Sequence, residues 1–544
     1  MISLGREHLF RQHYFGLLRV NNMLQPLFIN TFQKGASENA NIGNGTFLGI
    51  ETYSKKGVAR LTKDSVKTSG SVVVDLPIYF ANHTEQDIFA QGDTGRVYRS
   101  IDGGVTWTDI TNPAWALGAG KGKGLVFFDG VLYAFFGTSP STALYYCVSP
   151  FGTGNWAAFS GATGLKGDQN FPFIFPSAYG FYFANGNKVG LLQEKVTGTA
   201  IDPTNSTTYN YSDSILTLPE IYEVTTLSFL PPTQLMIGTK SSGVGNDTQI
   251  ADLIGWDTLS LNKFSPPLRL YSNAYLGESG IKQLINRNNT LYAVTGGNHA
   301  VFQTNGATFN QIAEMGLRTN YRTSTGEQAT APVFLNPRQS AIAIIGNKIL
   351  TGVSTSTVNE APSGSYALAP MGVWSIAFME DNDMAIQCEF PISTGTIRSN
   401  DFIIGAVHPV YEGRILIGWK DGSNYGIDIT EAKKYQNDIN TVWIESAMMQ
   451  VGTPLNPTPI RSVEFNFVRD LISGQSFSLY GRNGFDQPYT LMQTFDPAID
   501  GSKNSYKNVK NSIGQCQYFQ ILVQMKTGSP NEAWSPELRN IIIQ

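Results

Sequence analysis

The sequence predicts an all-β protein in which a β-propeller of about seven four-stranded blades is followed by a C-terminal β-sandwich. Three observations predict this fold. Short runs of β-branched and aromatic residues alternate with clusters of Gly, Asn, Asp and Ser, about every 8–12 residues. Helical periodicity is almost absent, and the best helical stretch, Thr430 to Tyr435, is short. Similar units of about 40–55 residues repeat through the middle of the chain.

The composition of the 544 residues fits a folded β protein and excludes several classes. Aromatic residues make up 12% of the chain and charged residues only 15%, so a disordered chain or a coiled coil is excluded. The formal net charge of −4 argues against a protein that binds nucleic acid by a basic face. No apolar run approaches the ~18 residues that a membrane span needs, so we expect no membrane insertion.

The repeats place the propeller at residues 58–437. Several units share a strand of apolar residues followed by Tyr-Ala, as in Gly130–Ala134 and Asn289–Ala293. The candidate units are 58–113, 120–162, 170–200, 221–270, 279–315, 328–391 and 397–437. A four-stranded blade is apolar on both faces and needs a neighbour on each side, which a closed ring supplies. The polar segment 201–218 is predicted to be a long loop on one face.

The two ends of the chain differ from the propeller in residue pattern and composition. Longer, cleanly alternating strands such as Arg461–Phe467 predict a separate sandwich over residues 438–544. Residues 23–57 are predicted to form an N-terminal arm. Residues 1–22 carry scattered Arg and His and lack the apolar core of a secretory signal. They are either untranslated, with the start at Met23, or a short amphipathic helix or arm, and we expect the protein to be made in a cytoplasm.

One motif in the chain is sharp. Residues 100–107 fit the pattern S-x-D-x-G-x-T-W of the Asp-box, or BNR repeat, at Ser100, Asp102, Gly104, Thr106 and Trp107. The aspartate is expected to accept turn amides, the glycine to adopt positive φ, and the tryptophan to pack into the blade. We therefore predict a structural hairpin between the third and fourth strands of the first blade, with no catalytic residue.

The box resembles those of sialidases and of many propellers without enzyme activity. The Phe-Arg-Ile-Pro motif of sialidases is absent from this sequence. An arginine triad stays open by counting alone, from Arg269, Arg287, Arg318, Arg338, Arg398 and Arg414. A sialidase-like, glycan-active enzyme is therefore the alternative function, and a glycan-binding lectin-type propeller is a second alternative.

Other candidate sites are assigned structural interpretations. The three cysteines are far apart and are predicted to be free, and no H-x-x-x-H pair occurs, so we expect no metal and no cofactor. The acidic segment Glu380–Asp383 and the pair Asp496 and Asp500 are interpreted as solvated turns rather than Ca²⁺ sites. Six aromatic residues near strand ends either stack on sugars or fill gaps between blades: Tyr209, Tyr211, Trp256, Tyr321, Trp374 and Trp419.

A broader resemblance is carried by the two ends of the chain. Phe32-Gln-Lys-Gly35, Gly43-Asn-Gly45 and Tyr53-Ser-Lys-Lys-Gly57 follow one another, and Ser535-Pro-Glu-Leu-Arg539 precedes the last strand. With the box in an early blade, these segments resemble propeller proteins encoded beside virion genes of tailed bacteriophages. The resemblance implies a structural, non-enzymatic virion protein of the tail: a nozzle, a tail-tip component or an adhesin.

That resemblance also sets the expected partners and location. Other virion tail proteins are the expected partners, and a host-surface glycan is a further candidate. A homo-oligomeric ring around the tail axis is the natural way to place such a subunit on a symmetric tube. The expected location is the tail of the virion.

Overall fold

The computed structural model describes residues 27–29, 46–48, 50–51, 58–138, 141–166, 170–171, 173–177, 180–230, 234–241, 251–257, 269–270, 280–296, 300–304, 309–314, 318–322, 328–332, 337–354, 372–378, 384–390, 402–435, 443–446, 448–452, 457–484, 487, 489–508, 514–527 and 535–544. The chain divides into two compact units. One unit spans residues 63–434, and the other combines residues 1–62 with 435–544.

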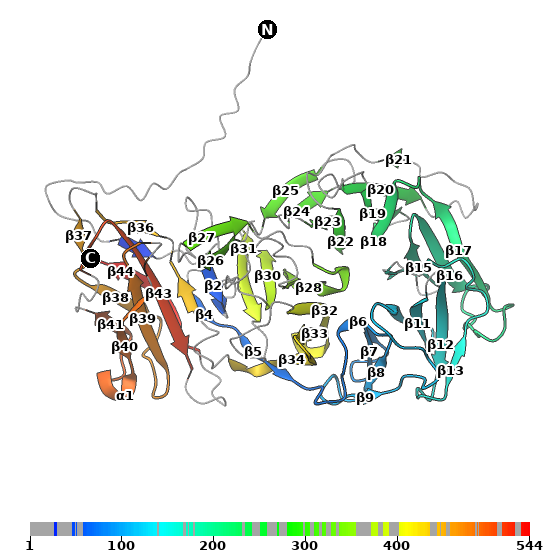
Figure 1. The fold of residues 1–544 in the computed structure, drawn as a ribbon, viewed down its shortest axis with the longest axis horizontal. Helices are drawn as coiled ribbons and strands as arrows, with labels where there is room; N and C mark the ends of the chain where they lie inside the picture. The colour runs from blue at the N-terminus through cyan, green and yellow to red at the C-terminus, as the bar shows by residue number, and fades with distance from the viewer. Residues whose placement is uncertain are drawn as a thin grey trace, which may run out of the picture. The chain divides into compact units, whose positions relative to one another are not determined.

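The larger unit is a β-propeller. Its described residues form six four-stranded antiparallel sheets and a seventh set of four consecutively paired antiparallel strands, β28 to β31, and the seven are named blades 1 to 7 in chain order (Figure 1). The strands of blades 1 to 4 are β6 (Pro77–Asn82), β7 (Ile88–Gly92), β8 (Val97–Ser100), β9 (Thr108–Asp109), β10 (Gly122–Phe128), β11 (Val131–Thr138), β12 (Ser141–Val148), β13 (Trp156–Ala158), β14 (Phe173–Ser177), β15 (Gly180–Asn185), β16 (Lys188–Glu194), β17 (Tyr209–Thr217), β18 (Tyr222–Leu230), β19 (Gln234–Ser241), β20 (Ala251–Asp257) and β21 (Arg269–Leu270).

Blades 5 to 7 complete the ring. Their strands are β22 (Ile281–Arg287), β23 (Thr290–Thr295), β24 (Ala300–Thr304), β25 (Phe309–Glu314), β28 (Ile342–Ile345), β29 (Lys348–Val353), β30 (Gly372–Phe378), β31 (Met384–Phe390), β32 (Ile403–Pro409), β33 (Ile415–Asp421), β34 (Asn424–Tyr435) and β5 (Lys63–Lys67). A hairpin of β26 (Arg318–Arg322) and β27 (Gln328–Pro332) and the 3₁₀ turn η2 (Gln339–Ala341) lie between blades 5 and 6 in the chain, and the turn η4 (Tyr411–Gly413) joins β32 to β33. The all-β propeller prediction is confirmed.

The ring closes because each blade buries an apolar face against the next. Phe135 of blade 2 and Phe171 and Phe183 at blade 3 belong to one core, with ring centroids 4.7 Å apart for Phe135 and Phe171. Blade 1 shares one core with blade 2 and another with blade 7. The outer strand of blade 7 is β5, from the start of the unit, so the first strand of the propeller completes its last blade.

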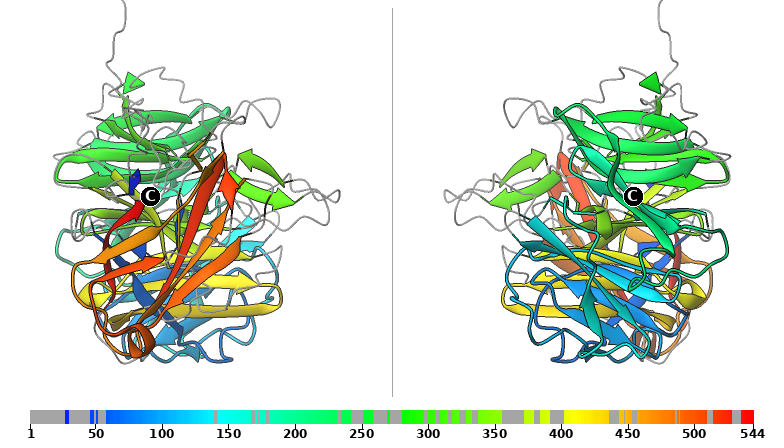
Figure 2. Two further views of the ribbon diagram at one scale, coloured as in Figure 1. Left: turned by 90° about the vertical axis from the view of Figure 1, so that its left-hand side faces the viewer. Right: turned by 90° about the vertical axis from the view of Figure 1, so that its right-hand side faces the viewer.

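The smaller unit is a sandwich of two sheets. One sheet has the order β3 (Ile50–Glu51), β4 (Ala59–Leu61), β44 (Glu537–Ile543), β38 (Val463–Phe467) and β41 (Ser505–Asn508), and β1 (Leu27–Ile29) also pairs with β44. The other contains β2 (Thr46–Leu48), β35 (Trp443–Glu445), β43 (Tyr518–Lys526), β39 (Ser476–Arg482) and β40 (Thr490–Phe495), and β36 (Met449–Gln450) also pairs with β43. Figure 2 shows its orange and red strands running side by side. A small ladder of β37 (Thr458–Pro459) and β42 (Gln515–Cys516) and the helix α1 (Pro497–Asp500) complete the unit.

Aromatic rings from both sheets fill the core of the sandwich. The rings of Phe477 and Phe495 stack with centroids 4.6 Å apart, and Phe465 of the opposite sheet lies 4.8 Å from Phe477. Strands from the N-terminal segment therefore belong to the same unit as the C-terminal strands, whereas the sequence suggested a separate arm.

Three local expectations from the sequence differ from the structure. The segment 201–218 contains β17, the outer strand of blade 3, because its polar side chains fall on an edge strand that water can reach. Thr430 to Tyr435 is part of β34 rather than a helix, because the pairing of β34 with β33 on one side and with β5 on the other overrides the helix propensity of this segment. Asp496 caps the short helix α1, where its carboxylate accepts the Ala498 amide at 2.9 Å, and Asp500 is the last residue of that helix.

Candidate functional site

The five predicted motif residues lie in one hairpin, Ser100–Trp107, between β8 and β9. The Ser100 hydroxyl donates to Asp102 Oδ1 over 2.7 Å and accepts the Gly104 amide at 2.8 Å. Asp102 Oδ1 also accepts the amides of Val105 at 3.0 Å and Thr106 at 2.8 Å. Asp102 Oδ2 accepts the Thr106 hydroxyl at 2.6 Å. The carboxylate is therefore occupied by donors of its own turn.

The electrostatics of Asp102 follow from these contacts. Partial burial by itself raises the pKa of the carboxyl group. Hydrogen bonds from Thr106, Ser100 and the Val105 amide lower the pKa by more than burial raises it. The net pKa lies below the usual value, so the group is ionised at neutral pH. Its charge stabilises the turn rather than serving as a free acid or base.

Trp107 and Gly104 connect the hairpin to the body of the propeller. The Trp107 indole Nε1 donates to the Gly104 carbonyl at 3.1 Å, and its ring is buried in the core between blades 1 and 7. Gly104 has φ +95°, and a Cβ there would lie 2.6 Å from Leu416 Cδ2 of blade 7. Both the backbone conformation and the close approach therefore require glycine.

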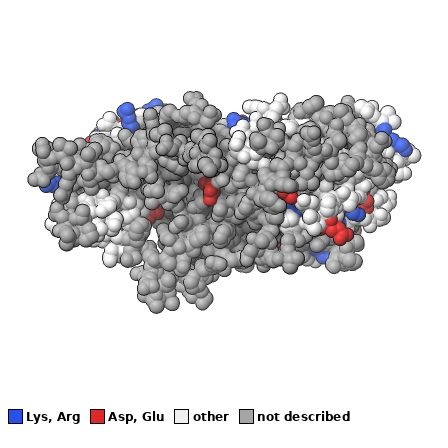
Figure 3. All heavy atoms as spheres, turned by 90° about the horizontal axis from the view of Figure 1, so that it is seen from above, with Lys and Arg blue, Asp and Glu red and all other residues white. Residues whose placement is uncertain are grey.

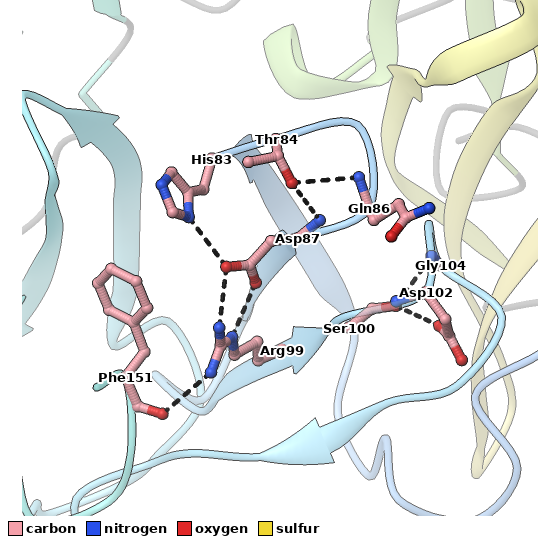
Figure 4. A network of polar contacts seen from close by, with 9 residues as sticks. All are labelled: His83, Thr84, Gln86, Asp87, Arg99, Ser100, Asp102, Gly104 and Phe151. Carbon is pink, nitrogen blue, oxygen red and sulfur yellow. Dashed lines mark hydrogen bonds and ion pairs between the residues drawn. The ribbon is translucent and has the colours of Figure 1, made fainter. Parts of the chain in front are cut away.

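A second polar cluster beside the hairpin was not predicted from the sequence. Arg99 binds Asp87 through two parallel contacts, Nε to Oδ1 at 2.7 Å and Nη2 to Oδ2 at 2.8 Å (Figure 4). His83 Nδ1 lies 2.9 Å from Asp87 Oδ2. Arg99 Nη1 donates to the Phe151 carbonyl at 3.4 Å. Since Phe151 belongs to the blade 2 side, this cluster joins blade 1 to blade 2.

Aromatic rings enclose the cluster around Asp87. The guanidinium of Arg99 lies 5.2 Å from the Phe151 ring centroid and 5.7 Å from that of Phe89. Burial raises the pKa of Asp87, but the hydrogen bonds and charges of Arg99 and His83 outweigh it and leave the pKa below the usual value. The sequence signal that could have found the site is the His83-x-x-x-Asp87 pair at the β6–β7 turn.

Four of the six aromatic residues proposed as sugar-stacking candidates lie between blades. Tyr209 and Tyr211 pack at the core of blades 2 and 3, and Trp256 packs at the core of blades 3 and 4. Trp374 is fully buried, and Trp419 lies in the core between blades 6 and 7. The Tyr321 side chain lies outside the described residues. Tyr209, Tyr211, Trp256 and Trp419 therefore fill interblade gaps, which was the structural alternative from the sequence.

The described arginine side chains have separate surroundings. Arg287 stacks 4.7 Å from the Phe378 ring, and Arg338 Nη1 lies 4.0 Å from Asp93 Oδ1. Arg414 lies beside Gly103 of the hairpin described above. The side chains of Arg269 and Arg318 and all of Arg398 lie outside the described residues, as do the acidic segment 380–383 and residues 1–22.

The segment that leads into blade 6 ties several blades together. The Gln339 side chain donates to Gln283 Oε1 of blade 5 at 3.1 Å, and the Ser340 hydroxyl donates to the Gly405 carbonyl of blade 7 at 2.9 Å. The Arg338 contact with Asp93 adds blade 1. This turn therefore connects blades 1, 5 and 7.

The described residues were also compared with what a metal site, a membrane span and a basic binding face require. Within the described ranges, no group of three or more His, Cys, Asp or Glu is arranged to hold a metal ion. None of the described helices is both long and apolar enough to span a membrane. On the face drawn in Figure 3, the described Lys and Arg side chains are scattered among Asp and Glu, without a broad basic area.

Comparisons with known proteins return propeller structures. No protein-family model matches the chain, and no curated protein matches it. A structure of YCF48 bound to D1 peptide is similar at a TM-score of 0.36 and 8% identity, covering 69% of this chain and 96% of that chain. The WD40 β-propeller domain of Doa1 is similar at 0.36 and 9%, covering 69% and 98%. A glycoside hydrolase is similar at 0.28 and 11%, covering 88% and 99%. At these TM-scores the likenesses carry no argument about function.

Proposed function

We propose that this protein is a structural, non-enzymatic component of a tailed-phage virion, located in the tail as a nozzle, tail-tip or adhesin subunit. The propeller is the rigid module that contacts neighbouring subunits or a host-surface glycan. Other tail proteins are its partners, and several copies form a ring around the tail axis.

The observation that carries the proposal concerns the segment Ser535–Arg539, on which the resemblance to phage tail proteins partly rests. The Leu61 amide donates to Ser535 Oγ over 2.8 Å. In the antiparallel ladder of β4 and β44, Arg60 lies opposite Glu537. The segment is thus bonded to the strand that directly follows the N-terminal motifs of the same resemblance. Both ends of the chain therefore contribute strands to one unit.

The polar chemistry of the described site supports a structural role as well. The Asp102 carboxylate is occupied by its own turn, and Asp87 is occupied by Arg99 and His83. The Arg99 contact to Phe151 and the Gln339 contact to Gln283 connect neighbouring blades. A ring braced in this way resists deformation, which suits a particle that transmits force during attachment.

Immunogold labelling of purified virions with an antibody against the C-terminal unit tests the proposal. Gold at the end of the tail is the expected result. Unlabelled virions beside a soluble pool in the infected-cell lysate would overturn it, and a glycosidase or glycan-binding screen of the soluble protein would then follow. The ring is tested by light scattering of the protein mixed with its tail partners, where a monomer at every concentration would contradict it.

A further inference from the structure

The ring of the propeller depends on one short strand for closure. β5 (Lys63–Lys67) is the outer strand of blade 7, although it precedes blade 1 in the chain. If β5 detached, the outer edge of β34 would lose its partner and blade 7 would keep three strands. An unpaired strand edge invites pairing with other chains, so this strand needs firm anchoring.

The residues that follow β5 are anchored at two places. The Thr68 amide donates to the Ile427 carbonyl of β34 at 2.9 Å, and the Ile427 amide donates to Ser69 Oγ at 3.1 Å. The second anchor lies outside blade 7. The Thr68 hydroxyl donates to the carbonyl oxygen of Gly104 over 2.6 Å. We call β5 together with Thr68 and Ser69 the closing segment. This segment is therefore bonded directly to the Ser100–Trp107 hairpin of blade 1.

The hairpin is held rigidly where it receives this bond. The Gly104 carbonyl also accepts Trp107 Nε1 at 3.1 Å, and the Gly104 amide donates to Ser100 Oγ. The Gly104 backbone lies against Leu416 of β33 so closely that a Cβ would not fit. The ring of Trp107 shares a buried core with Leu416 and Ile427. The carbonyl that accepts Thr68 is thus fixed from both blades.

The same hairpin is braced on its other side. The Gly103 amide donates to the Gln86 carbonyl at 2.8 Å. Gln86 precedes Asp87, which Arg99 binds while it also contacts the Phe151 carbonyl. A continuous polar path therefore runs from the closing segment through blade 1 to the edge of blade 2.

We propose that the Ser100–Trp107 hairpin is the latch that keeps the propeller ring closed, with Thr68 as the residue that engages it. The role goes beyond the local turn geometry that the motif predicts. The Asp102 carboxylate acts here as a positioning residue, because it shapes the turn that presents the Gly104 carbonyl to Thr68. The inference concerns the isolated chain and does not depend on the proposed tail function.

Hydrogen exchange measured by mass spectrometry on the full chain tests the latch. Thr68→Val removes the hydroxyl, and with it the bond to Gly104 and a longer 3.3 Å contact of the hydroxyl with the Ile427 carbonyl, but leaves the backbone bond to Ile427. Thr68→Ser keeps a hydroxyl and serves as the conservative rescue. Asp102→Ala disturbs the turn from the other side. We expect Thr68→Val and Asp102→Ala to speed exchange about tenfold in peptides covering 63–69 and 424–430, the loss expected for about one hydrogen bond.

Asp202→Ala is the matched control. Asp202 accepts the amide and hydroxyl of Thr204 at 2.9 and 2.6 Å in an exposed turn, much as Asp102 holds Thr106, but these bonds stay within its own turn between β16 and β17. This variant and Thr68→Ser should leave exchange at 63–69 and 424–430 unchanged, and peptides within 180–230 should stay unchanged in the two latch variants. Unchanged exchange at 63–69 in both latch variants would overturn the proposal. An equal increase in every blade would overturn it too.

Discussion

The indole Nε1 of Trp419 donates to the Asp428 carboxylate over 2.6 Å, inside the core between blades 6 and 7. Asp428 is fully buried and also accepts the Ser65 hydroxyl of the closing strand at 3.3 Å. A ring that the sequence offered as a sugar-stacking candidate is thereby tied to the strand that completes blade 7. Its contribution is to the stability of the ring.

Replacing Trp419 by Phe removes a donor to a buried carboxylate. We expect the free energy of unfolding to fall by about 1–3 kcal/mol, the usual result when a buried charged acceptor loses a partner. Trp256→Phe is the control, because the Trp256 Nε1 is buried without a hydrogen-bond partner among the described residues. Chemical denaturation of both variants decides the matter, and equal losses would contradict the assigned role of the Asp428 bond.

Gly104→Ala tests the close approach of the hairpin to blade 7. The new Cβ would have positive φ and would lie 2.6 Å from Leu416 Cδ2, so we expect a loss of about 2–4 kcal/mol. Gly120→Ala has a similar φ of +72° but open space around the Cβ, and should cost only about 1 kcal/mol. Thermal melts of the two variants separate packing from backbone strain. A Gly104 variant as stable as the Gly120 variant would refute the packing argument.

Arg99→Lys tests the two-point contact with Asp87. A lysine keeps the charge but cannot donate through two parallel N–H groups, so we expect a loss of about 1–2 kcal/mol. Arg96→Lys is the control, because Arg96 makes one contact to Asp109 at 2.7 Å and both side chains are about one-third exposed. An exposed pair of that kind contributes little, about 0–1 kcal/mol. Denaturant titrations that gave both variants the same loss would show that the fork geometry is unimportant.

The stability of the propeller should depend on acid through Asp87. Its folded pKa lies below the usual value of about 3.9, so the stabilisation is present above about pH 4 and is lost as the pH falls through the folded pKa. Asp87→Asn should therefore flatten the acid side of a stability–pH profile measured by denaturation. A profile as steep as that of the parent protein would show that other carboxylates control the acid loss.

Asp75 should act in the opposite sense. Burial raises its pKa despite hydrogen bonds from Thr94 and Tyr98. A raised carboxyl pKa favours folding fully below the unfolded value, and this contribution is lost as the pH rises through the folded pKa. Asp75→Asn is thus expected to change the dependence of the free energy of unfolding on pH above about pH 4. Asp87→Asn should leave that part of the profile unchanged.

Much of the fold was predictable from local patterns. Alternating runs such as Arg461–Phe467 became strands because a half-buried sheet requires period-two alternation. The S-x-D-x-G-x-T-W spacing predicted the turn at Ser100–Trp107 correctly, since its hydrogen bonds span only a few residues. The polar segment 201–218 was assigned to a loop because an edge strand such as β17 needs no apolar alternation on its wet face.

The candidate site was only half predictable. The five residues of the hairpin were found because their partners lie within eight positions of one another. The Arg99 and Asp87 pair was missed because the two residues are brought together by cross-strand register, with Arg99 opposite Phe89. Phe151 joins the same cluster from another blade. No local sequence pattern predicts a contact between residues 52 positions apart.

By itself, the sequence determined the β class, the repeated strands, the motif turn and the change of texture near residue 438, because each depends on neighbours along the chain. Only the tertiary structure decided that β5 completes the last blade, that the N-terminal strands join the C-terminal sandwich, and that Thr68 meets Gly104. These pairings connect distant segments. Their selection depends on which buried faces and unpaired edges remain once the blades have formed, and that information exists only when the whole chain has packed.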